Sequence, residues 1–548
     1  MRKPRILWCG ESSFLHTGYA IYGKEVLDRL FDTGKYEIAE FSVYGKESDF
    51  ISQRPRWKYY SNMPTAEYEW DLYHSSPINQ FGAWRFEDVC LDFKPDIVCD
   101  PRDWWMMQHE RTSPFRKFYH WMVMPAIDSA PLQNEWLESF QNADTLFAYS
   151  EFGRDVIQEA SCGQVSVKDV CSPSADTACF YPVPDKRAHK EAMGISGDSQ
   201  IIGTVMRNQK RKLYPDLIQS FKEFCTRYPI ISEDVFLYLH VSYPDIGWDI
   251  PNLINQSGVA HKILLTYYCN SCNTAFPSFL SNAINVCKSC GSRSAMMPNA
   301  QNAVPTEALG NIMSCFDLYV QYSICEGFGM PQVEAAHCSV PVMAMDYSAM
   351  SSVIENIDAT AIDVRLFREM ETGTFRALPD NEDFIEKLKQ FFTLPKTVRA
   401  VQGHKTYTKC IENYSWDKTA KKWEDAIDEV ELKDHKETWD SEHDIQEPLN
   451  IPDPSSLSPR ELVEMCIKNV IRKPDMLHTL EHLKMLRNLN DGFMTEVLTI
   501  ATHRKKFDPY SVDDLIQECV GIRHHINEWE HKRVFGYEKP EFILRANQ

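Results

Sequence analysis

A glycine-containing run in the second half of this 548-residue chain places two carboxylates beside the start of an expected helix. The run extends over residues 325–336 and reads CEGFGMPQVEAA. Its glycines let the backbone bend closely around a ligand, and Pro331 fits the first turn of a helix, so Glu334 is expected about one turn inside that helix. Glu326 and Glu334 are suited to accept hydrogen bonds from sugar hydroxyls, while free N–H groups at a helix start suit phosphate. Either glutamate alone is also explained as a favourable residue near a helix start.

A basic run offers the positive charge that a diphosphate would need. Residues 207–213 read RNQKRKL, with four cations in six residues directly after an apolar segment that we interpret as a strand. Arg207 and Lys212 are the two that we single out as phosphate ligands. A basic run of this kind is more often a solvated surface turn, so the pattern needs support from elsewhere in the chain.

Four cysteines have the spacing of a metal site. They form the pattern Cys269-x2-Cys272-x14-Cys287-x2-Cys290 within the second half of the chain. Two Cys-x2-Cys knuckles allow four thiolates to surround one zinc ion tetrahedrally, and a complete set of four leaves no open position for catalysis. The sequence therefore predicts a structural zinc ribbon over about residues 267–298; the alternative is two unrelated cysteine pairs. Such a ribbon is a candidate module for binding an acceptor or a partner.

Strands alternate with helices through most of the chain, which predicts an α/β fold with parallel sheets. A strand, a glycine-containing loop and a helix follow one another from Arg5 to Leu30. Further strands are expected at 94–99, 118–123 and 145–149, and in a second series at 201–205, 235–241, 262–266, 318–321 and 340–345. We therefore expect two doubly wound, Rossmann-like domains that face a cleft, with the ribbon inserted in the second and a helical extension at the C-terminus.

The domain limits follow from breaks in this alternation. We expect an N-terminal acceptor domain over 1–182 and a donor domain over 199–405, followed by a helix over 406–430. Residues 431–450 contain seven acidic residues and two lysines, which is typical of a solvated linker. Residues 451–548 show helical spacing of apolar residues and predict a helical accessory domain that packs on the body or on a second subunit.

The composition is that of a folded protein: 43% of the residues are hydrophobic and 25% are charged. The first residues are too polar for a signal peptide, and no apolar stretch is long enough to cross a bilayer, so we expect a cytoplasmic protein whose 17 cysteines are mostly reduced. A net charge of −20 argues against non-specific coating of nucleic acid, although it leaves room for a local basic surface.

The spacing Glu326-x7-Glu334 resembles the signature of the family-four retaining glycosyltransferases, which have the B-type fold. The resemblance covers roughly residues 1–430 and includes other segments. These are the glycine loop at 17–20, the Asp-x3-Phe-x-Pro run at 176–182, Arg207 and Lys212, the stretch 304–323, and Tyr414-Ser415-Trp416 at the start of a helix that crosses back to the first domain. Ser339 and Leu213 depart from the family pattern, because glycine is common at both positions.

The resemblance implies a role for each matching residue. Arg207 and Lys212 are expected to hold the diphosphate of a nucleotide sugar without help from a divalent metal. Glu326 is expected to bind sugar hydroxyls and Glu334 the ribose. The remaining residues expected around the donor are Gly18, Ser323, Phe328, Gly329 and Met330, the last three through their backbone. The reaction would retain the configuration of the anomeric carbon through attack on the face that the phosphate leaves.

Residues that meet the acceptor are harder to identify from sequence. Asp103, His120 and Asp128 lie at expected strand ends, and each is equally well explained as a loop or core residue. The acceptor itself has two candidates: a hydroxymethylated pyrimidine in DNA, as in viral enzymes that modify their genomes, or a lipid-linked or surface polysaccharide. A non-catalytic scaffold that binds sugar nucleotides is a third hypothesis, disfavoured because both glutamates and both cations are present. The oligomeric state cannot be inferred.

Overall fold

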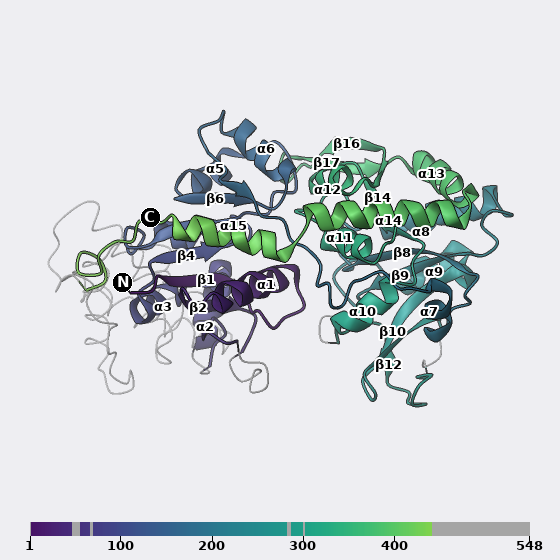
Figure 1. Ribbon diagram of the computed structural model, residues 1–548, viewed down its shortest axis with the longest axis horizontal. Coiled ribbons are helices and arrows are strands. Elements are labelled where there is room, and N and C mark those ends of the chain that lie inside the picture. The colour runs from purple at the N-terminus through teal and green to yellow at the C-terminus, as the bar shows by residue number, and fades with distance from the viewer. Residues whose placement is uncertain (1, 47–54, 66–68, 282–285, 300–301, 441–548) are drawn as a thin grey trace, which may run out of the picture.

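Two sheets built mainly of parallel strands form the body of the computed structural model, which describes residues 2–46, 55–65, 69–281, 286–299 and 302–440 (Figure 1). This arrangement confirms the predicted α/β fold class with two doubly wound domains. The helical region expected at 451–548 lies outside the described residues. So does the second half of the expected linker.

The first sheet contains seven parallel strands in the order β3-β2-β1-β4-β5-β6-β7. Its strands are β1 (Arg5–Glu11), β2 (Glu37–Val43), β3 (Lys58–Ser61), β4 (Ile97–Asp100), β5 (His120–Val123), β6 (Thr145–Ala148) and β7 (Asp169–Val170). Both faces are buried, because Ile6 and Trp8 of β1 belong to one apolar cluster while Leu7 and Cys9 belong to another. The connecting helices are α1 (Gly18–Asp32), α2 (Glu69–Ser75), η2 (Pro77–Phe81), α3 (Phe86–Phe93), α4 (Gln108–Thr112), α5 (Asn134–Gln141) and α6 (Glu151–Ala160).

The second sheet has the order β11-β10-β9-β8-β13-β14-β15, with β12 also paired to β10. Its strands are β8 (Gln200–Met206), β9 (Val235–Val241), β10 (Ile263–Cys269), β11 (Thr274–Phe279), β12 (Ala295–Met296), β13 (Leu318–Gln321), β14 (Val342–Met345) and β15 (Thr360–Ile362). All pairs are parallel except those that β10 makes with β11 and β12. The helices are α7 (Lys186–Ala192), α8 (Tyr214–Arg227), α9 (Ile250–Ser257), η3 (Ala260–Lys262), α10 (Thr306–Met313), α11 (Met330–His337), α12 (Ala349–Ile357) and α13 (Asn381–Thr393).

A hairpin and two long helices complete the described chain. The hairpin consists of β16 (Val364–Arg368) and β17 (Phe375–Pro379), and the helices are α14 (Lys396–Asn413) and α15 (Trp416–Asp428). Figure 1 shows α14 along the second domain and α15 along the first. Trp423 of α15 is fully buried: its ring lies 5.0 Å from that of Trp8, and its Nε1–H donates to the Tyr22 hydroxyl at 2.8 Å. The chain therefore returns to the first sheet after completing the second.

The first residues after α15 differ from the solvated linker expected for 431–450. The Trp439 side chain is buried against Phe115 and Phe118, and its Nε1–H donates to the carbonyl of Pro95 at 3.0 Å. His435 lies 3.0 Å from Asp96. An aromatic residue inside an acidic run thus anchors residues 431–440 to the first domain. None of the helices in the described part of the chain is long and apolar enough to cross a membrane.

Candidate active site

The basic run follows β8 directly and lies at the carboxyl end of the second sheet. The Arg207 guanidinium is 56% exposed and makes an ion pair with Asp245, 3.0 Å from Nε to Oδ2. Lys212 is almost fully buried and pairs with Glu326, as does Arg211, whose Nη1 lies 2.8 Å from Oε2 of the same carboxylate. Ligands of open parallel sheets bind at this edge. The predicted phosphate cations therefore stand at a suitable edge, one exposed and one buried.

Glu326 is the centre of a buried polar cluster. Lys212 and Arg211 pair with its two oxygens, and the Gln321 side-chain amide donates to Oε1 at 2.7 Å. Its backbone N–H donates to the Ser348 hydroxyl at 2.9 Å. This carboxylate, in the loop that follows β13, therefore holds two cations.

The charges of this cluster act on one another. Burial would raise the pKa of Glu326, but the charges and hydrogen bonds of Lys212 and Arg211 outweigh burial and hold this pKa at about 2. Burial lowers the pKa of Lys212 to about 8, although Glu326 opposes the shift. At neutral pH the carboxylate is therefore ionised and the lysine is mostly protonated. Two cations face one anion, so the cluster has positive charge to offer a phosphate.

Helix α11 begins next to this cluster. Gly329 is its N-cap with φ of 88°, in the left-handed region that favours glycine, and Pro331 lies in the first turn. Glu334, one turn inside as predicted, is 7% exposed, and burial raises its pKa to about 7. Because no cation offsets that burial, Glu334 differs electrostatically from Glu326. A buried carboxyl of this kind suits hydrogen bonding to neutral hydroxyls rather than to phosphate.

The other donor residues expected from the resemblance have different surroundings. Ser323 is buried and its hydroxyl donates to the carbonyl of Cys325 at 2.9 Å, so it shapes the loop that carries Glu326. Phe328 is buried with its ring edge against Tyr414, 5.5 Å between centroids. Met330 is partly buried at the first position of α11. Their proposed roles through the backbone stay predictions.

The two domains approach each other closely at these loops. A Cβ atom on Gly18, the first residue of α1, would lie 3.8 Å from the Met330 sulfur, and one on Gly327 would lie 3.0 Å from the Ala126 side chain. Gly327 thus allows the loop to pass the first domain without a clash. The glycine loop predicted from sequence therefore lies opposite the start of α11.

Two of the three expected acceptor residues face the second domain. Asp128 accepts a hydrogen bond from Arg376 of β17 at 2.8 Å, and the Cys325 thiol lies 3.2 Å from its other oxygen. Burial raises the pKa of Asp103 to about 7, with a further contribution from Asp128, while Arg211 lowers it. Asp103 and Asp128 thus border the site from the first-domain side.

His120 is the exception, and its expected role is not supported by its position. It is the first residue of β5, paired with Ile97 at the amino end of β4, whereas Asp103 follows the carboxyl end of β4. Its Nε2 lies 2.8 Å from the Thr145 hydroxyl. Since parallel strands place their two ends at opposite edges of the sheet, His120 lies at the edge away from the site.

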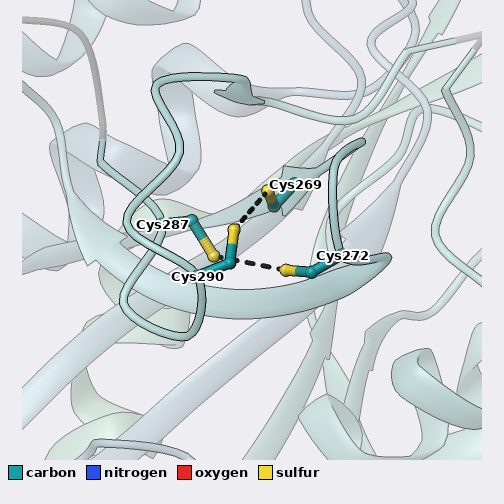
Figure 2. A group of neighbouring side chains, drawn as sticks. All are labelled: Cys269, Cys272, Cys287 and Cys290. Carbon is teal, nitrogen blue, oxygen red and sulfur yellow. Dashed lines mark hydrogen bonds between the residues drawn. The ribbon is translucent and has the colours of Figure 1, made fainter.

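The four predicted zinc ligands converge at the end of β10. All their sulfur atoms lie within 4.8 Å of one another, with 3.7 Å between those of Cys269 and Cys290 and 3.5 Å between those of Cys272 and Cys287 (Figure 2). Zinc–sulfur bonds of about 2.3 Å in a tetrahedron imply sulfur–sulfur distances of about 3.8 Å. The thiols are thus already spaced as zinc ligands require, and the cluster fits a zinc-ribbon insertion.

Comparison with known proteins agrees with this architecture. Residues 300–413 match the family model described as "Glycosyl transferases group 1". The fold is that of the B-type glycosyltransferases. The matched segment contains Glu326 and Glu334, whereas the basic run precedes it. No curated protein sequence matches the chain.

Similar solved structures span both domains. Sucrose-phosphate synthase from Thermosynechococcus elongatus is 15% identical, with a TM-score of 0.54 over 78% of this chain and 98% of that one. A glycosyltransferase from Rickettsia africae is also 15% identical, with a TM-score of 0.54 over 78% and 99%. HepE from Anabaena, solved with UDP and glucose, is 11% identical, with a TM-score of 0.55 over 78% and 100%. At these identities the likeness concerns the fold.

Sequence reasoning did not single out several residues of the site. Arg211 stands within the basic run, but spacing alone did not distinguish it from its neighbours. Asp245, Gln321, Ser348 and Arg376 come from separate loops and strands without a motif of their own. Only their contacts with Arg207, Glu326 and Asp128 identify them.

Proposed function

We propose that this chain is a retaining glycosyltransferase that moves a sugar from a nucleotide diphosphate sugar to a hydroxyl acceptor in the cytoplasm. The observation that carries the proposal is the buried cluster of Lys212 and Arg211 around Glu326, beside the start of α11. The family match over residues 300–413 and the fold support the same conclusion. HepE, which has the same fold, was solved with UDP-glucose, and this supports a nucleotide sugar as donor.

In this proposal each group of the donor has a partner. Arg207 and Lys212 bind the diphosphate, Glu326 accepts hydrogen bonds from the sugar, and Glu334 does so from the ribose. The backbone of Phe328, Gly329 and Met330 contacts sugar and phosphate. Arg207 turns from Asp245 to the phosphate when donor binds, because its exposed side chain is held by a single carboxylate.

Bond changes occur at the anomeric carbon. Its bond to the diphosphate oxygen breaks, and the acceptor oxygen bonds to the same face, so the configuration is retained. The acceptor's proton passes to the departing phosphate oxygen. Negative charge grows on that phosphate, and preorganised cations are the most effective stabilisers of such charge. Because Arg207 and Lys212 supply them, the proposed chemistry needs no divalent metal.

For the acceptor, the charges on the first-domain side favour an uncharged hydroxyl compound over DNA. Asp103 and Asp128 border this side. Glu11, at the end of β1, is a third carboxylate there: burial raises its pKa, and the charge of nearby Arg207 lowers it. Carboxylates would repel the phosphates of a nucleic acid. The hydroxymethylated DNA suggested from sequence therefore stays the alternative, and a glycan is the acceptor that we favour.

The proposal is tested by offering the purified protein a panel of sugar nucleotides and measuring release of nucleoside diphosphate. We expect hydrolysis of one or a few donors, and loss of at least about a hundredfold in Glu326→Gln, which keeps the shape but removes the charge that positions both cations. A panel that is neither bound nor hydrolysed would overturn the proposal. Product anomers analysed by NMR distinguish retention from inversion.

A further inference from the structure

Three aromatic rings gather at the carboxyl end of the first sheet. Tyr44 follows β2, Phe81 ends η2, and Trp105 lies in the segment after β4. The Phe81 and Trp105 rings are 4.8 Å apart at 90°, and Tyr44 lies 6.4 Å from Phe81 at 86°. Yet Tyr44 is 45% exposed and Trp105 is 42% exposed. Two large aromatic rings that stay exposed on either side of a third offer a ligand a flat apolar surface.

Buried charges hold this aromatic surface in place. The Arg102 side chain is 1% exposed and donates to the Phe81 carbonyl at 3.0 Å. Its Nε donates to Asp100 at 2.9 Å, and Glu110 lies on its other side at 3.5 Å. Since Arg102 is rigidly paired, both the end of η2 and the chain leading to Trp105 are fixed. The surface therefore exists before any ligand arrives.

The same surface leads toward the donor site. Glu11, at the end of β1, lies close enough to Tyr44 for its charge to contribute to the raised pKa of the Tyr44 hydroxyl. Arg207 of the second domain lies close enough to Glu11 for its charge to lower the pKa of Glu11. Asp103, two residues before Trp105, accepts a hydrogen bond from Tyr19 and lies within reach of the charge of Arg211. The aromatic rings thus adjoin carboxylates that border the proposed site of transfer.

Exposed rings beside carboxylates suit a sugar better than a nucleic acid. The C–H groups on one face of a pyranose carry partial positive charge and complement the negative face of an aromatic ring, while its hydroxyls donate to carboxylates. A nucleic acid also stacks on aromatic rings, but its phosphates need a basic groove. Here Arg102 is buried and already paired, and Lys46 lies with its ammonium 5.9 Å above the Trp70 ring.

We infer that Tyr44, Phe81 and Trp105 form the binding surface for a neutral saccharide acceptor, whose hydroxyls are held by Glu11 and Asp103. This inference rests on the proposed function for the act of transfer, whereas saccharide binding itself does not depend on it. It assigns the glycan acceptor that we favour to a surface of three aromatic rings on the first domain, opposite the cations of the second.

The test compares Trp105→Ala, Tyr44→Ala and the conservative Trp105→Phe with the unaltered full-length chain. Binding of a panel of neutral di- and trisaccharides is measured by calorimetry without donor, and transfer is measured with the donor found in the hydrolysis assay. Loss of one stacking ring is expected to weaken saccharide binding, and to raise the acceptor KM, about tenfold. Trp105→Phe should recover most of the binding. Donor hydrolysis should be unchanged in all three variants.

Ile230→Ala serves as the control, because Ile230 is 88% exposed between α8 and β9, at the opposite edge of the second sheet. Saccharide binding that is equal in Trp105→Ala and the unaltered chain would overturn the inference. So would failure of every saccharide to bind, or transfer to hydroxymethylated DNA alone. Failure of donor hydrolysis with intact, Trp105-dependent saccharide binding would instead count against the proposed function and leave the saccharide surface standing.

Discussion

The backbone N–H of Tyr243 donates a 2.8 Å hydrogen bond to the carbonyl of Pro298, which joins the end of the cysteine ribbon to the loop after β9. In the same loop the Ser242 hydroxyl donates to Asp245 at 2.6 Å, and Asp245 holds Arg207. A chain of direct contacts therefore runs from the ribbon to an expected phosphate ligand.

From this connection we predict that loss of the ribbon's metal weakens donor binding. Cys290→Ser, or treatment of the protein with a chelator, should release one zinc ion per chain and loosen the segment that ends at Pro298. Because Arg207 would then be less well positioned, the KM for the sugar nucleotide should rise roughly tenfold, with a smaller change in kcat. Metal analysis and donor-dependent hydrolysis are measured on the same samples.

The control for the ribbon variant is Cys162→Ser, since Cys162 is an exposed thiol outside the ribbon. It should retain both metal and donor affinity. If zinc is lost and donor KM does not change, the ribbon has no part in positioning Arg207. Absence of zinc from protein purified without chelator would exclude the ribbon itself.

A second prediction concerns Ser339, one of the two positions that depart from the glycosyltransferase pattern described above. Its φ is 57°, in the left-handed region just after α11, where a side chain costs about 1 kcal/mol. Ser339→Gly should therefore raise the free energy of unfolding by up to about 1 kcal/mol, measured by urea denaturation. Gly329→Ala provides the matched opposite: φ there is 88° and a Cβ would lie 2.4 Å from the Gln332 side chain, so stability should fall. Equal loss of stability in both variants would contradict the argument.

How far sequence predicts the fold is clear from individual strands. The strands expected at 235–241 and 318–321 coincide with β9 and β13. Each is an apolar run, and such a run predicts a strand buried on both faces without knowledge of its neighbours in the sheet. Strand β2 was not predicted, since Glu40 interrupts its apolar pattern. That carboxylate is fully buried, with hydrogen bonds from Ser13 and from Trp57 at 2.8 Å. Partners distant in sequence thus make the strand possible.

The position of a site residue could be predicted where the motif that contains it lies within one short segment. Glu326 and Glu334 lie as their spacing indicates, on either side of a glycine turn. His120 was misplaced because β5 begins at this residue, so that it lies at the amino end of the strand, whereas ligands of a parallel sheet meet the carboxyl ends. Arg376 was missed because its role depends on a hairpin from the second domain reaching Asp128 of the first. Such contacts arise only from the docking of the two domains.

A third prediction follows from the pKa of about 7 that burial gives Glu334. Because this folded-state pKa lies above the unfolded value near 4.5, the folded chain binds the proton more tightly. Stability should therefore fall as pH rises from about 4.5 to 7, by an amount on the order of a few kcal/mol at most. Glu334→Gln should flatten this part of the curve, measured as unfolding free energy against pH. Asp103, whose pKa burial also raises to about 7, should leave a residual slope of similar size over the same pH range.

That result would be contradicted by a curve of Glu334→Gln parallel to that of the unaltered chain. Asp103→Asn, made in the same way, separates the two contributions, since it should remove the residual slope and leave that of Glu334. Both variants are compared at one ionic strength, because screening changes the contribution of exposed charges more than that of these buried groups.

The last prediction separates the two expected phosphate ligands by their burial. Arg207→Ala removes an exposed guanidinium with one carboxylate partner, so stability should change by about 1 kcal/mol or less while transfer falls by at least about a hundredfold. Lys212→Ala also should abolish transfer, but it leaves buried Glu326 with one cation fewer and should destabilise the fold by roughly 3 kcal/mol. Unfolding free energies and transfer rates are measured for both variants.

The double variant Lys212→Ala/Glu326→Gln distinguishes the two effects of the lysine, because it removes the buried charge together with its partner. It should recover much of the lost stability and none of the lost transfer. Arg227→Ala, which removes an exposed arginine paired with Glu382, should leave transfer unchanged. Full transfer by Arg207→Ala would remove that residue from the donor site. Normal stability of Lys212→Ala would show that Arg211 alone suffices to compensate Glu326.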